Sequence, residues 1–147
     1  MTPDVNVLVA AFRADHPHHG VARSWFDAQL AACRDGGSLR LLPMAVASFL
    51  RLVTSDRVFF TPAPIEQAVA FVDALLSAPG VEFGELGSEW PQLRQMCLDK
   101  ALAANDIPDA WIAAAVVQQG EHLASFDRDF ARLLSKSRWT LLGTASP

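Results

Sequence analysis

The chain has 147 residues, of which 51% are hydrophobic, and it carries a formal net charge of −4. This length and apolar content suit one compact domain with a sizeable core and exclude a disordered tail or linker protein. The net negative charge excludes a broad basic surface, so any bound nucleic acid would depend on local arginines and on metal.

In the first half of the chain, helical patterns alternate with short strand-like segments. A very short leading strand, 1–3, ends at Asp4, and its proline and sparse apolar content are typical of an irregular edge strand. Asn6 is expected to cap a helix that carries Leu8 and Phe12 on one face. The other elements of this half are expected to be helices over 21–33, 43–53 and 65–76 and a strand over 39–42.

The second half continues this alternation. A strand is expected over 81–83, and Ser88 with Pro91 opens a further helix. Pro108 is expected in the first turn of the next helix, which Gly120 ends. The last elements are expected to be a strand over 122–125, a helix that begins at Asp127 and a strand over 139–142.

Helices that alternate with short strands indicate an α/β fold with a mainly parallel central sheet covered on both faces. No internal repeat or low-complexity tract is visible, so residues 1–147 are expected to form a single domain. Ligands of such sheets bind beyond the carboxyl ends of the strands, where the chain order reverses. Side chains that directly follow a strand are therefore the first candidates for a functional site.

Three aspartates stand where an apolar segment gives way to a helix: Asp4, Asp109 and Asp127. Taken singly, each is more typical of a helix-start residue, favoured by unpaired amides and the helix dipole. Taken together, they would repel one another at one edge of the sheet, and a bound hard cation is the usual relief. Oxygen donors select magnesium or manganese over zinc, and such an ion suits phosphodiester hydrolysis by an activated water.

Four sequence blocks, which follow one another along nearly the whole chain, carry a family resemblance. They are Asp4-Val5-Asn6-Val7-Leu8, Ser48-Phe49-Leu50-Arg51-Leu52-Val53-Thr54, Pro108-Asp109-Ala110 and Ser125-Phe126-Asp127-Arg128-Asp129-Phe130. With these blocks the chain resembles a PIN domain, specifically a VapC-type toxin of a type II toxin–antitoxin system. The resemblance implies a three-layer α/β/α fold and a metal-dependent endoribonuclease in the cytoplasm.

The resemblance also implies roles and partners. Asp4, Asp109 and Asp127 would hold Mg²⁺ or Mn²⁺, directly or through water, and would be catalytic together with Asp129 as an auxiliary acid. Asn6 and Ser125 would give polar support within the site. The partners implied are an RNA substrate, a second copy of the chain and a cognate antitoxin. Because the site is acidic, the antitoxin is expected to block it with a basic segment.

The helix expected over 43–53 departs from the family pattern. Many members carry a glutamate where this chain has Ala45-Val46-Ala47-Ser48, and the helix contains no acid. Ser48 can accept a hydrogen bond or hold a water but supplies no charge, which predicts a weaker or more hydrated ion. Arg51, one turn further on, is expected either to support the site by facing the substrate or to be an ordinary surface arginine.

Two further features favour a structural interpretation. His16, His18 and His19 lie in a proline-broken loop without a matching carboxylate or thiol, so a solvated connection is favoured over a metal site. Trp111 closely follows Asp109, where a tryptophan could stack on a base, but its helical spacing favours packing in the core.

The sequence gives no indication of export or membrane insertion. No apolar run approaches the roughly 20 residues needed to span a bilayer. The first residues, with the early Asp4, do not have the pattern of a cationic leader followed by a hydrophobic stretch. Cys33 and Cys97 stand far apart and form no CxxC pair, which is typical of thiols in a reducing compartment. We therefore expect a cytoplasmic protein.

Two alternative functions stay open. A PIN-like module that has lost activity and only binds RNA or protein is favoured by the missing acid near Ser48, although the four aspartates oppose it. A haloacid-dehalogenase-type phosphatase would need Asp4 as nucleophile, a second acid where the chain has Asn6, and a well-placed lysine. The chain contains only Lys100 and Lys136, so this alternative is the weaker one.

Overall fold

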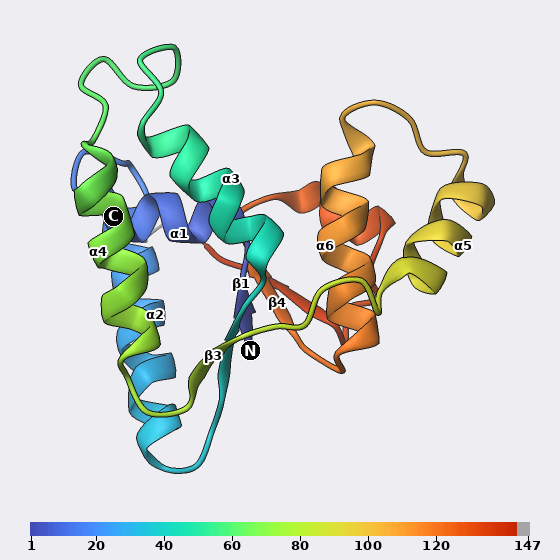
Figure 1. Cartoon of the computed structure of the whole chain (residues 1–147). Helices are drawn as coiled ribbons and strands as arrows, with labels where there is room; N and C mark the ends of the chain where they lie inside the picture. The colour runs from blue at the N-terminus through green and yellow to red at the C-terminus, as the bar shows by residue number, and fades with distance from the viewer. Residues whose placement is uncertain (144–147) are drawn as a thin grey trace.

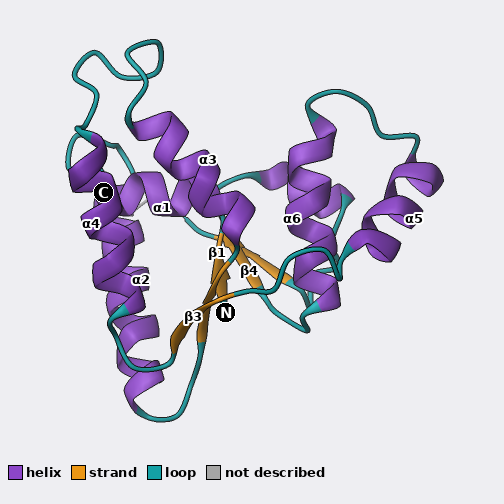
Figure 2. Cartoon of the chain, in the orientation of Figure 1, coloured by secondary structure: helices purple, strands orange, loops and turns teal. Residues whose placement is uncertain are grey.

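The computed structural model describes residues 1–143. Helices and short strands alternate along it, as Figure 1 and Figure 2 show. In chain order the elements are β1 (Thr2–Pro3), α1 (Val5–Phe12), α2 (His19–Arg34), β2 (Leu39–Leu41), α3 (Pro43–Val53), α4 (Ile65–Leu76), β3 (Val81–Phe83), α5 (Trp90–Lys100), α6 (Asp106–Gln118), β4 (Leu123–Ser125), the 3₁₀ helix η1 (Arg128–Arg132) and β5 (Trp139–Leu141). The predicted α/β class is confirmed. The single domain over 1–147 stays a prediction, and residues 144–147 lie outside the described part of the chain.

All strand pairs in residues 1–143 are parallel. One sheet has the order β1-β4-β5, and the other pairs β2 with β3. The backbone N–H of Arg40 in β2 donates to the carbonyl of Met1 at 2.8 Å, which places β2 beside the start of β1. The strands therefore follow the order β3-β2-β1-β4-β5, and the direction of chain order reverses at β1. The carboxyl ends of β1 and β4 form the switch point where ligands of such sheets bind.

The strand β1 is short, as predicted, but it is not an edge strand. Thr2 and Pro3 are fully buried between β2 and β4. The amides of Thr2 and Asp4 donate to the carbonyls of His122 and Ala124, both at 2.9 Å. Pro3 lies between these two donors, where an amide would face away from β4, so the missing N–H costs no bond in this ladder. The prediction of an irregular edge was wrong because β2 covers the other side of this strand.

Two groups of helices cover the strands. Helices α1 to α4 pack on one another on one side, and α5 packs on α6 on the other side (Figure 1). Helices α1 and α6 are apolar nearly all round, which is typical of helices buried at the centre of a protein. Both bury a continuous run of residues, Val7–Ala11 in α1 and Ile112–Val116 in α6. This arrangement confirms the three-layer fold. Within residues 1–143, no helix combines the length and the apolar character that crossing a membrane requires.

The start of α1 differs from the prediction in one respect that matters for the site. Asp4, not Asn6, is the N-cap, and its Oδ1 accepts a hydrogen bond from the amide of Val5 at 2.7 Å. Asn6 lies inside the helix, and its side chain reaches across to the end of β4. The cap was misassigned because Asp4 both ends β1 and begins α1, with no residue between them.

Of two later helix starts, one agrees with the prediction and one differs. Helix α6 begins at Asp106, whose side chain accepts a hydrogen bond from the amide of Ala103 at 3.2 Å, so Pro108 and Asp109 lie in its first turn as predicted. Asp127 caps a short 3₁₀ helix rather than an α-helix, and its Oδ1 accepts from the amide of Asp129 at 2.8 Å.

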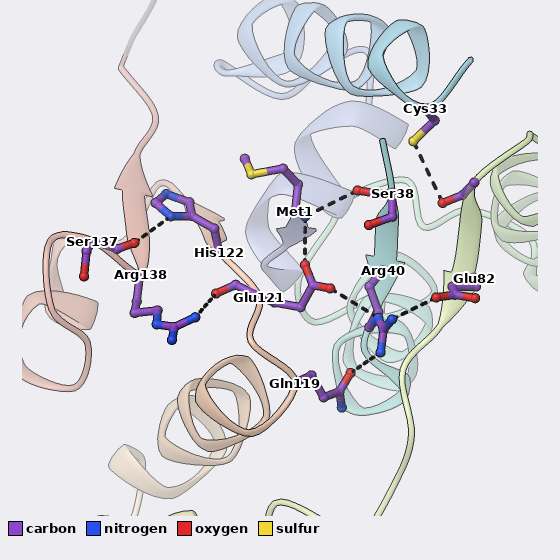
Figure 3. A network of polar contacts seen from close by, with 11 residues as sticks. Met1, Cys33, Ser38, Arg40, Glu82, Gln119, Glu121, His122, Ser137 and Arg138 are labelled. Carbon is purple, nitrogen blue, oxygen red and sulfur yellow. Dashed lines mark hydrogen bonds and ion pairs between the residues drawn. The ribbon is translucent and has the colours of Figure 1, made fainter. Parts of the chain in front are cut away.

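A network of charged side chains joins the two sheets at the amino end of β1 (Figure 3). Buried Glu121, just before β4, accepts a hydrogen bond from the amino group of Met1 at 2.8 Å and pairs with Arg40 at 3.3 Å. Arg40 also pairs with Glu82, its register partner on β3, at 2.8 Å. The network lies at the opposite end of β1 from Asp4, so its role is to hold the sheet together.

Candidate active site

The structure brings Asp4 and Asp127 to the ends of neighbouring strands. Asp4 follows β1 directly, and Asp127 is two residues beyond β4, with Pro3 and Ala124 in register. Asp109 lies in the first turn of α6. The charges of Asp109 and Asp127 both act on Asp4 and raise its pKa, so the three predicted aspartates share one electrostatic environment.

Asp4 is buried, and burial is the main reason why its pKa is raised to about 6 from the usual 3.8. The hydroxyl of Ser125 donates to its Oδ2 at 2.6 Å, and the amide of Val5 donates to its Oδ1. Both bonds favour the ionised form and oppose the shift, whereas the charges of Asp109 and Asp127 add to it. Asp4 is thus a rigidly held carboxylate that titrates close to neutral pH.

Ser125 connects the two strand ends. While it donates to Asp4, its buried oxygen accepts from the side-chain amide of Asn6 at 3.2 Å and from the backbone amide of Asp127 at 2.9 Å. The carbonyl oxygen of the Asn6 side chain also accepts from the amide of Phe126 at 3.2 Å. Asn6 and Ser125 therefore lie where polar support was expected, and they fix the position of Asp127 relative to Asp4.

Asp109 is half-buried, and its pKa is raised first by that burial and then by the charges of Asp127 and Asp129. Arg132 opposes the shift and is itself paired with Asp106 at 3.3 Å. Asp129 thus lies near the other acids, as predicted. Sequence reasoning missed Arg132, which faces the cluster from η1, because no short motif links it to Asp109.

The donor set of this cluster fits a hard divalent cation, since it consists of carboxylate, hydroxyl and amide oxygens. The spacing fits less closely: within residues 1–143, no group of three or more His, Cys, Asp or Glu side chains is arranged to hold an ion. An ion shared by the three aspartates would therefore need water molecules in part of its coordination shell, as Mg²⁺ usually retains.

A cleft of about 820 Å³ opens beside the acids, between α3 and α6. Asp109 is its acidic residue, and Ser48 and Arg51 lie on its α3 wall. The rest of the lining is mostly apolar, from α1, α3, α6 and the segment after β3. Ser48 and Arg51 thus line the same cleft as Asp109, and the supporting role of Arg51 stays a prediction.

Trp111 also lines this cleft and is 39% exposed, so the prediction that it packs in the core was wrong. Its indole Nε1–H donates to the carboxylate of Glu89 at 2.6 Å. Glu89 is buried in front of α5, and sequence reasoning missed it because a contact across 22 residues leaves no local pattern.

The histidine loop packs against the site rather than being a solvated connection. The ring of His18 stacks on Phe126 with centroids 4.5 Å apart and an angle of 13° between the planes. His19 hydrogen-bonds through Nδ1 to the carbonyl of Ala10 at 2.8 Å. The solvated interpretation was wrong because Phe126, between Ser125 and Asp127, offers the loop an aromatic face.

Comparison with known proteins gives consistent matches along the chain. Residues 1–134 match the family described as PIN domain. Ribonuclease VapC31 of Mycobacterium tuberculosis is 44% identical over 135 residues, which cover 90% of this chain and 92% of the relative. Ribonuclease VapC25 of the same organism is 42% identical with the same coverage.

Solved structures with a similar fold share less sequence with this chain. Mycobacterium tuberculosis VapC20, described as a Sarcin-Ricin loop cleaving toxin, superposes with a TM-score of 0.63 at 17% identity, covering 88% of this chain and 92% of that one. VapBC2 from Rickettsia felis, bound to a DNA fragment from its promoter, gives a TM-score of 0.60 at 16% identity, covering 90% and 91%. At these identities the structures bear on the fold alone.

Proposed function

Because this chain belongs to the PIN-domain family and, within it, to the VapC ribonucleases, we propose that it is a ribonuclease toxin whose hydrolysis of RNA depends on Mg²⁺ or Mn²⁺. The ion would be held by Asp4, Asp109 and Asp127, in part through water. The observation that carries this proposal is the gathering of these aspartates at one end of the sheet, where burial first and then the charges of the neighbouring acids raise the pKa of Asp4 and of Asp109. A bound cation relieves the repulsion between these charges.

Each residue of the site has a part in the proposed reaction. A bound ion supplies an activated water and stabilises the charge that develops on the phosphoryl oxygen. Asp4, whose pKa is raised to about 6 without an ion, would be kept ionised by the bound cation and would act as its ligand. Ser125 and Asn6 hold Asp4 and Asp127 in place, and Asp129 acts as an auxiliary acid. Arg51 on the cleft wall attracts the substrate phosphates.

The test is to map RNA ends in cells that express the native chain or Asp109→Asn. Asp109→Asn should abolish metal-dependent cleavage, a loss of about a hundredfold or more in rate, because the variant lacks a charged ligand. Asp73→Asn, an exposed acid on α4, is the matched control and should cleave like the native chain. Equal cleavage by Asp109→Asn and the native chain would contradict the proposed site.

A weakened, non-catalytic module remains the second candidate, and a specific observation favours it. Ser48 lies on the cleft wall without an acidic side chain near it on α3. Loss of charge on this wall would lower the affinity for the ion. In that case the native chain would bind RNA but would cleave no faster than Asp109→Asn at any magnesium or manganese concentration. The family match leaves the phosphatase alternative without support.

We further propose that the chain forms a homodimer and that a cognate antitoxin inhibits it. Because the site is acidic, the antitoxin would place a basic segment against Asp4, Asp109 and Asp127, with an arginine in the place of the cation. Solved structures of similar fold include the Rickettsia felis VapBC2 assembly, which is consistent with a protein partner for this chain.

A further inference from the structure

The most unusual contact outside the acid cluster is the one between Glu89 and Trp111. Glu89 is only 2% exposed, and within residues 1–143 the single hydrogen bond of its side chain is the 2.6 Å bond from the Trp111 indole. Its second oxygen, Oε2, is buried and has no hydrogen-bond partner among residues 1–143. Burying a carboxylate costs more than one hydrogen bond returns, and an apolar side chain of similar size would stabilise the fold better. The contact therefore contributes something other than stability.

The contact fixes the orientation of an aromatic ring at the cleft. Trp111 lies in α6 two residues after Asp109, and both line the same cleft. Leu86 and Ile107, which are also exposed, extend the apolar surface beside the indole. An indole held by a buried carboxylate keeps its ring plane in the absence of a ligand, so the cleft presents a preformed flat aromatic surface next to the acids.

We propose that Trp111 is the stacking surface for one unpaired base of the RNA substrate and that Glu89 is its positioning residue. This inference rests on the proposed function and assigns a base-binding subsite to it. Single-stranded RNA is commonly recognised through bases that stack on aromatic side chains, and the strand then follows basic residues with its phosphates. Here Arg51 lies on the wall of the same cleft and supplies the cation for a phosphate.

Charge favours RNA over a peptide as the occupant. Among the described residues that line the cleft, Arg51 is the only basic one and Asp109 the only acidic one. The α3 wall, which carries Ser48 and Arg51, would repel the basic antitoxin segment expected at the acids but attracts a phosphate. The occupant of the apolar part of the cleft is therefore a nucleotide whose phosphate lies toward Arg51 and whose base lies on Trp111.

The test measures binding separately from cleavage. All variants are made in an Asp4→Asn background, so that binding is measured without cleavage; Asp4 does not line the cleft, and its replacement leaves the cleft lining unchanged. The probe is a short, unstructured, fluorescein-labelled single-stranded RNA. By fluorescence anisotropy, Trp111→Ala should weaken binding about tenfold or more, the effect of losing one base–aromatic stack. Trp111→Phe should retain part of the affinity. Trp90→Ala is the matched control: Trp90 is exposed at the start of α5 but does not line the cleft, and its loss should leave binding unchanged.

The role of Glu89 is tested by a double-mutant cycle. Glu89→Leu should weaken RNA binding when Trp111 is present but should have no further effect beside Trp111→Phe, because phenylalanine has no N–H for the carboxylate to hold. Glu89→Gln keeps an acceptor for the indole and should restore binding. A purely structural role of Glu89 would instead make Glu89→Leu equally harmful in both backgrounds. Thermal melting of each variant identifies any that fail to fold.

The outcomes separate this inference from the proposed function. If Trp111→Ala and Trp111→Phe bind the RNA as tightly as their parent, the stacking subsite is overturned even when the native chain cleaves RNA. If binding depends on Trp111 but the native chain shows no metal-dependent cleavage, the subsite stands and only the proposed reaction fails. If the variants weaken binding of an arginine-rich antitoxin peptide and not of RNA, the cleft belongs to the protein partner and the inference is wrong.

Discussion

At the scale of single residues, Asp4 has several structural roles at once. It ends β1, caps α1 and accepts the hydroxyl of Ser125, and it is nevertheless buried beside two other acids. Its two hydrogen bonds do not outweigh burial, so ionised Asp4 weakens the fold in the absence of a cation. This cost is what makes the position suitable for a metal ligand.

A pH titration of stability should reveal this cost. In the folded chain the pKa of Asp4 is raised to about 6 from the usual 3.8, so the folded state binds the Asp4 proton more tightly than the unfolded state does. The contribution of Asp4 to stability is therefore most favourable below about pH 4 and is lost as the pH rises through about 6, by at most about 3 kcal/mol. Urea unfolding of the metal-free native chain and of Asp4→Asn at several pH values measures this difference.

Asp4→Asn removes the titration, so the variant should gain stability relative to the native chain as the pH rises from about 4 to about 7. Saturating Mg²⁺ should reverse the order at neutral pH by stabilising only the native chain. If the free energies of unfolding of the two proteins change in parallel across this pH range, the pKa of Asp4 is not raised in the folded chain.

At the scale of elements, the junction between α2, β2 and β3 depends on one close approach at Gly80. This glycine has a φ of +74°, and its carbonyl accepts from the amide of Leu39 at 2.9 Å at the start of β2. A Cβ at this position would lie 2.7 Å from the carbonyl oxygen of Gly37 and 3.1 Å from the Cβ of Cys33. Both the backbone conformation and the available space therefore require glycine here.

A matched pair of glycine substitutions separates these two causes. Gly36 has a φ of +93°, but a Cβ there would meet nothing within 4 Å, so Gly36→Ala should cost only the left-handed conformation, about 1–2 kcal/mol. Gly80→Ala should cost about 1–3 kcal/mol more, because backbone must move to relieve the clash. The free energies of unfolding in urea give the comparison. Equal losses of unfolding free energy in the two variants would mean that the backbone around residue 80 relaxes around the added Cβ and that the close approach adds nothing to the cost.

Elements set by local patterns could be predicted from the sequence, and those set by distant neighbours could not. The helix 65–76 and the strand 81–83 have the predicted bounds because their apolar spacing and flanking breaks are local. The interior position of β1 depends on β2, and the packing of His18 depends on Phe126.

The candidate site follows the same rule. Asp4 and Asp127 were found because each follows a strand, whereas the pairing of Glu89 with Trp111 and the approach of Arg132 to Asp109 depend on tertiary packing. Short motifs thus located the acids and, on the α3 wall, Ser48 and Arg51, but they did not reveal the contacts that Trp111 and Asp109 make with distant residues.

At the scale of the whole molecule, α4 is the surface best suited to the proposed homodimer. Helix α2 directs Ala22 and Phe26 into the core. Helix α4 instead exposes Ile65 and Val69, 47% and 40% exposed and one turn apart, next to a loop that carries fully exposed Phe60. An outward apolar face of this kind is typical of a protein–protein interface.

Introducing charge on this face should separate the subunits. Burial of each of these side chains contributes about 1.5–3 kcal/mol, so the double variant Ile65→Glu, Val69→Glu should raise the dissociation constant of the dimer about a hundredfold or more. Sedimentation velocity across a dilution series measures the change. Gln67→Glu adds a charge to an exposed position of the same helix between these two residues and should leave the dimer intact. If the native chain sediments as a monomer at all concentrations, the proposed homodimer is wrong. If the dimer persists in the double variant, the interface does not lie on α4.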